Sequence, residues 1–275
     1  MKQYILKITC NDEKGLIYKI TNIIFKYQIN IIKNDEFVSE GIFFFRAVLE
    51  GDFDTKIFLN TLRSELPQGA NMQFNNKSKK NIIIFVTKES HCLGDLLIKH
   101  YSNELNANIK AIISNYDELK DLVIKFKIPY HYISSENITR IKHEETILKY
   151  LNKYDFDYIV LAKYMRILSP NFVEYFKDKI INIHHSFLPA FIGANPYKQA
   201  YERGVKIIGA TAHFVNDKLD EGPIIYQAIS NINHEFTWQD MANAGRYIEK
   251  DVLSKALDLV FDDKIFIYKN KTIVF

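Results

Sequence analysis

The feature that most constrains the fold is a set of nearly continuous apolar runs in the second part of the chain. The first run covers 81–87, and the others lie at 109–114, 158–162, 179–183 and 207–215. Such runs are typical of strands covered on both faces, as the strands of a parallel sheet are. Helical patterns separate the first several runs, at 93–100, 117–126, 144–153 and 170–176. This alternation predicts βαβ units and an α/β domain with a mostly parallel sheet, ending in a long helix at 238–259 and a hairpin around Asn270.

The first 76 residues have a different pattern. Strands are expected at 4–10, 31–32, 42–49 and 71–74, and helices at 16–27 and 55–66. In the first helix, Ile17, Ile20, Ile24 and Tyr27 recur at intervals of three and four and share one face. The order βαββαβ is the ferredoxin-like arrangement.

A short polar and charged run, Lys77-Ser78-Lys79-Lys80, separates the two patterns. It favours a solvated linker over an anion-binding or nucleic-acid patch, because only a few charges are present. We therefore predict a small ferredoxin-like domain at 1–76, a linker at 77–80 and an α/β domain at 81–275.

Composition excludes several functional classes. Hydrophobic residues make up 47% of the 275 residues, enough for a buried core, and 36 basic against 33 acidic residues leave a formal charge of +3. That surplus is too small to indicate a nucleic-acid partner. Cys10 and Cys92 lie far apart without metal-ligand spacing, which argues against a disulfide scaffold and a zinc site. No signal or membrane segment is evident, so we expect a soluble cytoplasmic protein.

Polar residues gather where two of the predicted strands end. Asn182 and His184 alternate with Ile183 and therefore point to the same side of the sheet. His213 lies in the next strand, and an acidic loop containing Asp220 follows it. Ligands of open α/β sheets bind beyond the carboxyl ends of the strands. From these residues alone, the group is either a reacting centre or a set of hydrogen bonds that ties down loops.

Residues 181–191 and 213–223 resemble the two central motifs of the folate-dependent formyltransferase family. The resemblance implies a catalytic trio of Asn182, His184 and Asp220. Residues 164–169 look like the family's folate-binding loop. The resemblance implies that the substrate is bound by Tyr164, Met165, Arg166, Ile167 and Leu168. His213, which from its strand alone would be a core histidine, is given a supporting position beside the trio by the resemblance. His185 is included among the substrate-binding residues, although it could equally pack structurally.

Within this family the chain is most similar to the formyltetrahydrofolate deformylases. Glycinamide ribonucleotide formyltransferases carry a glycine-rich phosphate loop after their first strand, whereas residues 87–94 here contain one glycine and the carboxylate Glu89. Residues 193–197 and 199–204 also resemble the deformylases, and 11–16 resemble the first loop of their N-terminal ACT domain. The implied activity is hydrolysis of 10-formyltetrahydrofolate to formate and tetrahydrofolate, which would supply formate for purine synthesis and balance the folate pools.

The same resemblance implies the partners. Folate is the substrate, no metal or other cofactor is required, and the ACT domain would bind an amino-acid effector and favour a homo-oligomer. Lys14 stands where ACT loops often have proline, and Asn195 where deformylases usually have lysine. The peptide bond between Leu188 and Pro189 is expected to be cis. Two other functions stay open: formyl transfer to an amine acceptor such as glycinamide ribonucleotide or an amino sugar, and amino-acid sensing by a catalytically inactive chain.

Overall fold

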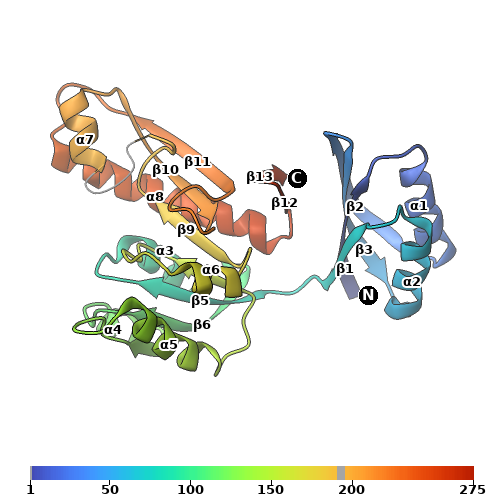
Figure 1. Ribbon diagram of the computed structural model, residues 1–275, viewed down its shortest axis with the longest axis horizontal. Helices are drawn as coiled ribbons and strands as arrows, with labels where there is room; N and C mark the ends of the chain where they lie inside the picture. Colours follow the sequence, from blue (N-terminus) through green and yellow to red (C-terminus); the bar gives the residue numbers. More distant parts are fainter. Residues whose placement is uncertain (1, 191–195) are drawn as a thin grey trace. The chain divides into compact units, whose positions relative to one another are not determined.

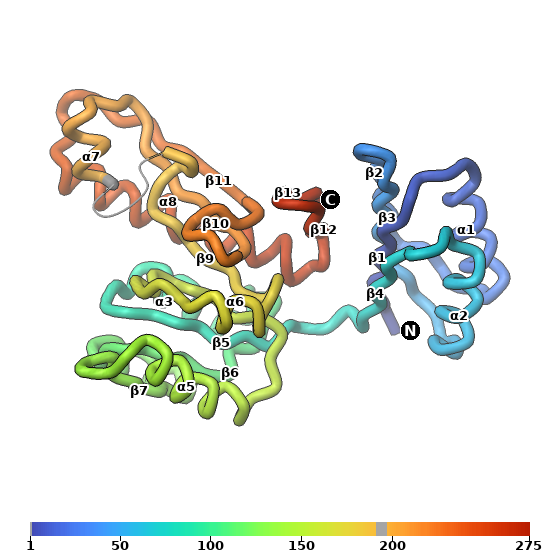
Figure 2. The backbone as a smooth tube through the Cα atoms, in the orientation of Figure 1, coloured from blue at the N-terminus to red at the C-terminus, as the bar shows by residue number. Residues whose placement is uncertain are grey.

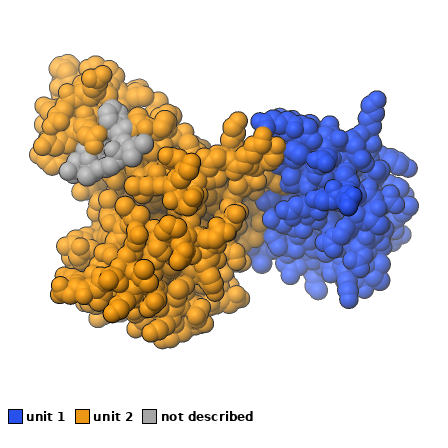
Figure 3. All heavy atoms as spheres, in the orientation of Figure 1, with its two compact units in different colours: residues 1–78, 275 blue, residues 79–274 orange. Residues whose placement is uncertain are grey.

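The computed structural model describes residues 2–190 and 196–275 and divides into two compact units (Figures 1 and 3). Unit 1 comprises Met1–Ser78 with Phe275, and unit 2 comprises Lys79–Val274. The deformylase-like segment at 193–195, including Asn195, lies outside the described residues. Within them, no helix combines the length and apolar character that crossing a membrane requires.

Unit 1 has the predicted βαββαβ order. Its elements are β1 (Lys2–Asn11), α1 (Leu16–Lys26), β2 (Asn30–Ser39), β3 (Ile42–Gly51), α2 (Thr55–Glu65) and β4 (Asn71–Asn76). The sheet order is β2-β3-β1-β4, and every neighbouring pair is antiparallel. Both helices pack on one face of this sheet, as Figure 2 shows, and their apolar side chains meet Leu6, Ile8 and Phe45 in the core.

The expected inward face of α1 is displaced by part of a turn. The buried residues are Leu16, Ile20, Ile23 and Ile24, whereas Ile17 is 45% exposed. Successive residues of a helix are separated by about 100°, so Ile17 lies at the rim of the buried stripe. Of the residues on the predicted apolar face, Ile20 and Ile24 are therefore buried, whereas Ile17 is not.

Unit 2 is built on a seven-stranded sheet in the order β11-β10-β9-β8-β5-β6-β7. The strands from β9 to β7 in this order are parallel, while β10 is antiparallel to both of its neighbours. The α/β fold with a mostly parallel sheet is confirmed. The strands are β5 (Lys80–Val86), β6 (Ala107–Ser114), β7 (Tyr130–Tyr132), β8 (Tyr158–Leu161), β9 (Ile180–His184), β10 (Ile207–Phe214) and β11 (Ile224–Asn231), with a separate hairpin of β12 (Ile265–Tyr268) and β13 (Lys271–Val274).

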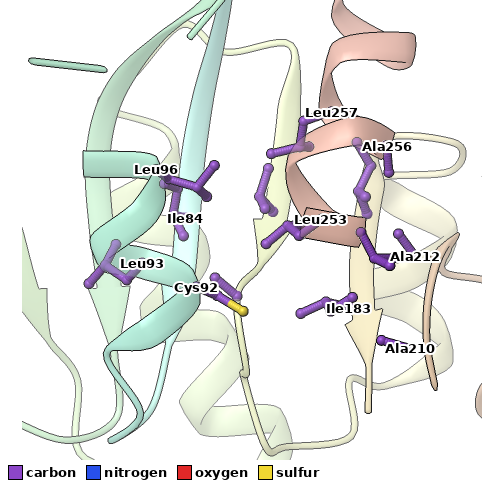
Figure 4. Close-up of a cluster of buried hydrophobic side chains, with 14 of the residues drawn as sticks. Ile84, Cys92, Leu93, Leu96, Ile183, Ala210, Ala212, Leu253, Ala256 and Leu257 are labelled. Atoms are coloured by element: carbon purple, nitrogen blue, oxygen red, sulfur yellow. The ribbon is translucent and has the colours of Figure 1, made fainter. Parts of the chain in front are cut away.

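Helices cover both faces of this sheet, which explains the continuous apolar runs. Ile84 points into a core with residues of α3 and α8, among them Leu96 and Leu253 (Figure 4). Its neighbours Ile83 and Phe85 enter a second core with residues of α5 and α6. The helices are α3 (His91–Tyr101), α4 (Lys120–Ile124), α5 (Arg140–Leu151), α6 (Pro170–Tyr175), α7 (Pro196–Arg203) and α8 (Trp238–Phe261).

Several elements of unit 2 were not predicted. Strand β11 lies at the edge of the sheet, where Ile225 is its one buried residue, and its sequence contains no long apolar run. Strand β7 is only three residues long, and α7 is rich in polar residues. The helix expected at 117–126 is shorter, because only Lys120–Ile124 is α-helical.

The basic run at 77–80 is not wholly solvated. Lys80 is the first residue of β5, and its ammonium Nζ lies 2.7 Å from Oδ2 of Asp263, which follows α8. Both side chains are at least nine-tenths buried, with 10% and 7% exposed. A lysine is buried in this way only when a carboxylate offsets the loss of its hydration. The prediction of a solvated position was wrong for Lys80.

The two adjacent lysines should differ in their contribution to stability. Lys80→Ala should lower the free energy of unfolding by about 3–5 kcal/mol, since it leaves a buried carboxylate without this cation. Lys79→Ala removes a hydrogen bond to Asn103 at the surface and should cost less than about 1 kcal/mol. Urea unfolding of both variants would test this, and equal effects would contradict the structural role of the buried pair.

Candidate active site

The antiparallel pairing of β9 with β10 brings the predicted catalytic residues together. In this register Asn182 lies opposite His213, and His184 lies opposite Thr211. The loop after β10 carries Asp220 back toward the same place. Both strands lie in the sheet of unit 2 in Figure 1.

The imidazole of His184 is held at one nitrogen and free at the other. Its Nδ1 lies 3.3 Å from Oδ1 of Asp220, and the residue is only 5% exposed. Its Nε2 is buried and has no hydrogen-bond partner within the described part of the chain. A buried nitrogen without a partner is costly in a folded protein. The atom is therefore available to a bound substrate.

A chain of hydrogen bonds sets the orientation of Asn182. The Nδ1 of His213 lies 2.8 Å from the carbonyl oxygen of Phe214, which can only accept. His213 therefore carries its proton on Nδ1 and accepts at Nε2 from Nδ2 of Asn182, at 3.1 Å. Burial lowers the pKa of His213, against the opposing effect of its bond to Phe214, so the neutral tautomer persists at neutral pH. The second N–H of the Asn182 amide is left for a ligand.

Asp220 sits at a special backbone position. Its φ of 57° is in the left-handed region, where aspartate and asparagine are tolerated better than most residues. Burial alone would raise the pKa of Asp220, but the hydrogen bond from His184 and the neighbouring imidazoles bring it below its ordinary value. The carboxylate is thus ionised at neutral pH and stabilises positive charge on His184.

Gly222 lets the Asp220 loop pass close to β10. A β-carbon at this residue would lie 1.7 Å from the carbonyl oxygen of Phe214. Any side chain here would push the loop away from the strand, and Asp220 would move with it.

The loop after His184 is fixed by Thr211. Its hydroxyl donates to the carbonyl of Ser186 at 2.9 Å and accepts from the amide of Leu188 at 3.0 Å. Gln227 also donates to the Leu188 carbonyl. The peptide bond between Leu188 and Pro189 is cis, as predicted.

His185 stacks against His184, with 5.1 Å between ring centroids and 26° between planes. It also lines a small apolar cavity of about 110 Å³ with Ser186, Tyr197 and Ile208. Burial, and secondarily the charge of Lys163, lowers the pKa of His185 to about 4. It is a neutral, mainly apolar neighbour of the reacting imidazole.

The predicted folate loop follows β8. Met165 and Ile167 are 59% and 58% exposed, and Arg166 and Leu168 are half-buried. Exposed apolar side chains beside a polar centre suit an aromatic ligand. Tyr164 instead points into the core, where its ring packs edge-on against Phe85 at 5.3 Å. Its contact with folate stays a prediction.

Sequence reasoning missed a second group of charges near this centre. The carboxylate of Glu249, on α8, is 1% exposed. Its Oε2 accepts from Nε2 of His91 at 2.7 Å and lies 3.2 Å from Nζ of Lys163, while its Oε1 accepts from the Tyr197 hydroxyl at 2.6 Å. Burial would raise the pKa of Glu249, but the bond from His91, the charge of Lys163 and the bond from Tyr197 lower it to about 2. The sequence did contain one indication of this group, because Glu249 is a charged residue on the otherwise apolar face of the long helix α8.

The same group contains residue types that bind metals. Ligand atoms of His91, Cys92 and Glu249 lie within 4.8 Å of one another. Lys163 and Tyr197 already occupy both oxygens of Glu249, and burial raises the pKa of Cys92 well above its ordinary value. A protonated thiol and a lysine-paired carboxylate make poor ligands. The arrangement therefore favours a cluster of mutually paired side chains over a metal site.

Comparisons with known proteins agree with the fold and the motifs. Residues 80–257 match the family model described as Formyl transferase, and residues 4–66 match the model described as ACT domain. Formyltetrahydrofolate deformylase of Haemophilus influenzae is 52% identical over 276 residues, covering 100% of this chain and 99% of the relative.

Solved structures fall into two groups. The deformylase from Pseudomonas syringae pv. tomato aligns over 100% of this chain and 95% of its own, with a TM-score of 0.95 and 34% identity. The phosphoribosylglycinamide formyltransferase from Anaplasma phagocytophilum covers 72% of this chain and 94% of its own, with a TM-score of 0.64 and 32% identity.

The close packing of Gly222 against the carbonyl of Phe214 can be tested with Gly94 as a control. Gly222→Ala should lower the free energy of unfolding by about 1–3 kcal/mol, because the added methyl group overlaps a backbone oxygen. Gly94→Ala, in α3, meets nothing within 4 Å and should leave stability unchanged or raise it. Thermal unfolding of both variants checks this prediction, which fails if the two substitutions have the same effect.

Acid stability should reveal the Glu249 cluster. The pKa of Glu249 is about 2 in the folded chain and 4.5 in the absence of the fold, so its ionisation stabilises the fold fully above pH 4.5 and progressively less toward pH 2. The contribution is of order 3 kcal/mol. We expect the stability difference between the wild type and Glu249→Gln to shrink as the pH falls from 6 to 3, as measured by urea midpoints. Parallel pH profiles would contradict this.

Proposed function

Because the chain belongs to the formyltetrahydrofolate deformylase family, it hydrolyses 10-formyltetrahydrofolate to formate and tetrahydrofolate, and we propose that Asn182, His184 and Asp220 carry out the reaction. The observation that supports these residues most directly is the unpartnered Nε2 of the buried His184, whose other nitrogen faces Asp220.

The reaction sets requirements that this centre can meet. Water adds to the formyl carbon, the carbonyl oxygen becomes an oxyanion, and the bond between the formyl carbon and N10 then breaks. One proton leaves the water and one arrives at N10, so a single group that accepts and then donates a proton is sufficient.

Asn182 is suited to the oxyanion. One of its amide N–H groups is engaged by Nε2 of His213, and the second is directed to a ligand by that same bond. The amide is held in this orientation before the substrate binds, so little reorganisation is needed as charge develops on the oxygen.

His184 is suited to the proton transfers. Its Nε2 takes a proton from the attacking water and passes it to N10 of the leaving folate. Asp220, ionised and facing Nδ1, stabilises the imidazolium formed between these steps and fixes the ring. This sequence uses only groups of the chain and the substrate.

The folate would lie along residues 164–168, with Met165 and Ile167 against the pterin and Arg166 near its polar edge. His185 and His213 act beside the trio, the first as a stacking neighbour of His184 and the second as the partner of Asn182. These placements are our proposal from burial and proximity.

The N-terminal unit is proposed to regulate the enzyme. A surface pocket of about 440 Å³ lies at the first loop, lined by Asp12, Glu13, Gly15, Leu16 and Phe37 among others. Its carboxylates suit the ammonium group of an amino-acid effector. A homo-oligomer and a role in supplying formate for purine synthesis also stay predictions, as does the cytoplasm, with which the free buried thiols of Cys10 and Cys92 agree.

The first test is formate release from 10-formyltetrahydrofolate by the purified protein without any amine acceptor. Asn182→Ala should lower kcat by about 10²–10³, the usual effect of losing one oxyanion donor, and His184→Ala by at least about 10². Asp220→Asn should lower kcat as well, while Asp217→Asn, an exposed residue of the same loop, should not.

An unchanged kcat in Asp220→Asn would contradict the proposal that Asp220 stabilises the imidazolium of His184. If the wild type binds folate but releases no formate, either alone or with added amino acids, then the formyl group has another acceptor and the proposed attack by water is wrong.

A further inference from the structure

The loop that carries Asp220 has little apolar packing at its tip. It spans 215–223 between β10 and β11, and residues 217–219 are exposed, including the apolar side chain of Leu219, which is 55% exposed. A cavity of about 480 Å³ borders this loop and the tip of the hairpin formed by β12 and β13. A segment with few buried contacts opens easily unless hydrogen bonds hold it. The position of Asp220 therefore depends on the hydrogen bonds of the loop.

Backbone bonds within the loop are short at its base and long near Asp220. At the base, the amide of Phe214 donates to the carbonyl of Pro223 at 2.9 Å. Closer to the tip, the amide of Glu221 donates to the carbonyl of Lys218 at 3.3 Å, outside the usual N–H···O range of about 2.7–3.2 Å. The backbone bonds of the loop thus fix its ends better than the part that bears the carboxylate.

The C-terminal hairpin supplies two side-chain donors to this part of the loop. Nδ2 of Asn270 donates to the carbonyl of Glu221, the residue directly after Asp220, at 2.8 Å. The hydroxyl of Thr272 donates to the carbonyl of Ile224, at the start of β11, at 2.6 Å. The backbone that leads from Asp220 into β11 is therefore tied to the hairpin at two points.

The hairpin is itself attached to the core of unit 2, so it can serve as a fixed support. Ile265 is 6% exposed and lies in the core with residues of α3 and α8, and Ile267 packs against that core. Just before β12, Asp263 forms the buried ion pair with Lys80. Asn270 lies in the two-residue turn of the hairpin. Reacting groups are held most precisely when a second layer of residues on rigid elements supports them.

We propose that Asn270 and Thr272 are positioning residues for the hydrolysis. They hold the backbone that follows Asp220, and its carboxylate thereby stays 3.3 Å from Nδ1 of His184. A displacement of about 1 Å at a reacting centre can lower a rate by about 10²-fold. Both residues act through backbone carbonyls, and their role rests on the proposed function of Asp220.

The first test is the kinetics of single variants of the hairpin. Asn270→Ala and Thr272→Val each remove one donor and should lower kcat by about three- to tenfold, the effect of one net hydrogen bond. KM should change by less than about twofold, because the predicted folate loop at 164–168 is untouched. Thr272→Ser keeps the hydroxyl and should retain the wild-type kcat. Lys271→Ala, at an exposed position between the two residues, is the matched control and should also retain it.

Combination with Asp220→Asn distinguishes positioning from a general loss of structure. If Asn270 acts through Asp220, then Asn270→Ala should have little further effect on kcat once the carboxylate is gone, although it has its full effect in the wild type. An equal fold-change in both backgrounds would overturn the positioning role. The double variant Asn270→Ala with Thr272→Val should have a lower kcat than either single variant, and a wild-type kcat in it would also overturn the proposal.

Hydrogen exchange gives a measurement that does not depend on catalysis. In the double variant Asn270→Ala with Thr272→Val, the amides at 215–223 should exchange faster than in the wild type, while those of β9 should not change. Unchanged exchange of the loop would overturn the inference even if kcat falls. If Asp220→Asn keeps the wild-type kcat, the proposed function of Asp220 fails, and exchange still decides whether the hairpin holds the loop.

Discussion

The reversal of strand direction between β9 and β10 is the constraint on which the candidate site depends. Parallel strands would place successive carboxyl ends side by side, but here an antiparallel neighbour sets Asn182 directly opposite His213. That register allows the amide to bond the imidazole, and the chain leaving β10 returns Asp220 to His184. A shift of one residue would turn each of these side chains to the other face of the sheet.

The hydrogen bonds among the amide, imidazole and carboxylate groups each have a fixed donor and acceptor, because the groups that end the chain of bonds can only accept. The carbonyl of Phe214 can only accept, which assigns the proton of His213, and the acceptor thus created assigns the amide of Asn182. On the other side, the ionised Asp220 can only accept from His184. The free N–H of Asn182 and the free Nε2 of His184 are the two positions left open, and a formamide carbonyl with an attacking water requires that pair of groups.

Much of the fold could be predicted because the strongest patterns reflect burial on both faces. The continuous runs identified the central strands, and alternation placed Asn182 and His184 together. The edge strand β11, the polar helix α7 and the buried state of Lys80 were missed, because each depends on a partner distant in sequence. For Lys80 that partner is Asp263, which lies 183 residues away. The trio came from resemblance to known motifs, whereas Glu249 became evident only when His91, Lys163 and Tyr197 were seen to surround it.

The left-handed backbone at Asp220 has a consequence for how this position can vary. Asparagine shares the tolerance of aspartate for that conformation, while glutamate, with its longer side chain, does not. A substitution that removes the charge therefore fits the native loop, and one that retains the charge strains it. Glutamate is closer to aspartate in charge, but asparagine is closer to it in the backbone conformation that it tolerates. If Asp220 has its proposed role, Asp220→Asn keeps the native loop but loses turnover, and this variant would hold unreacted substrate for structure determination.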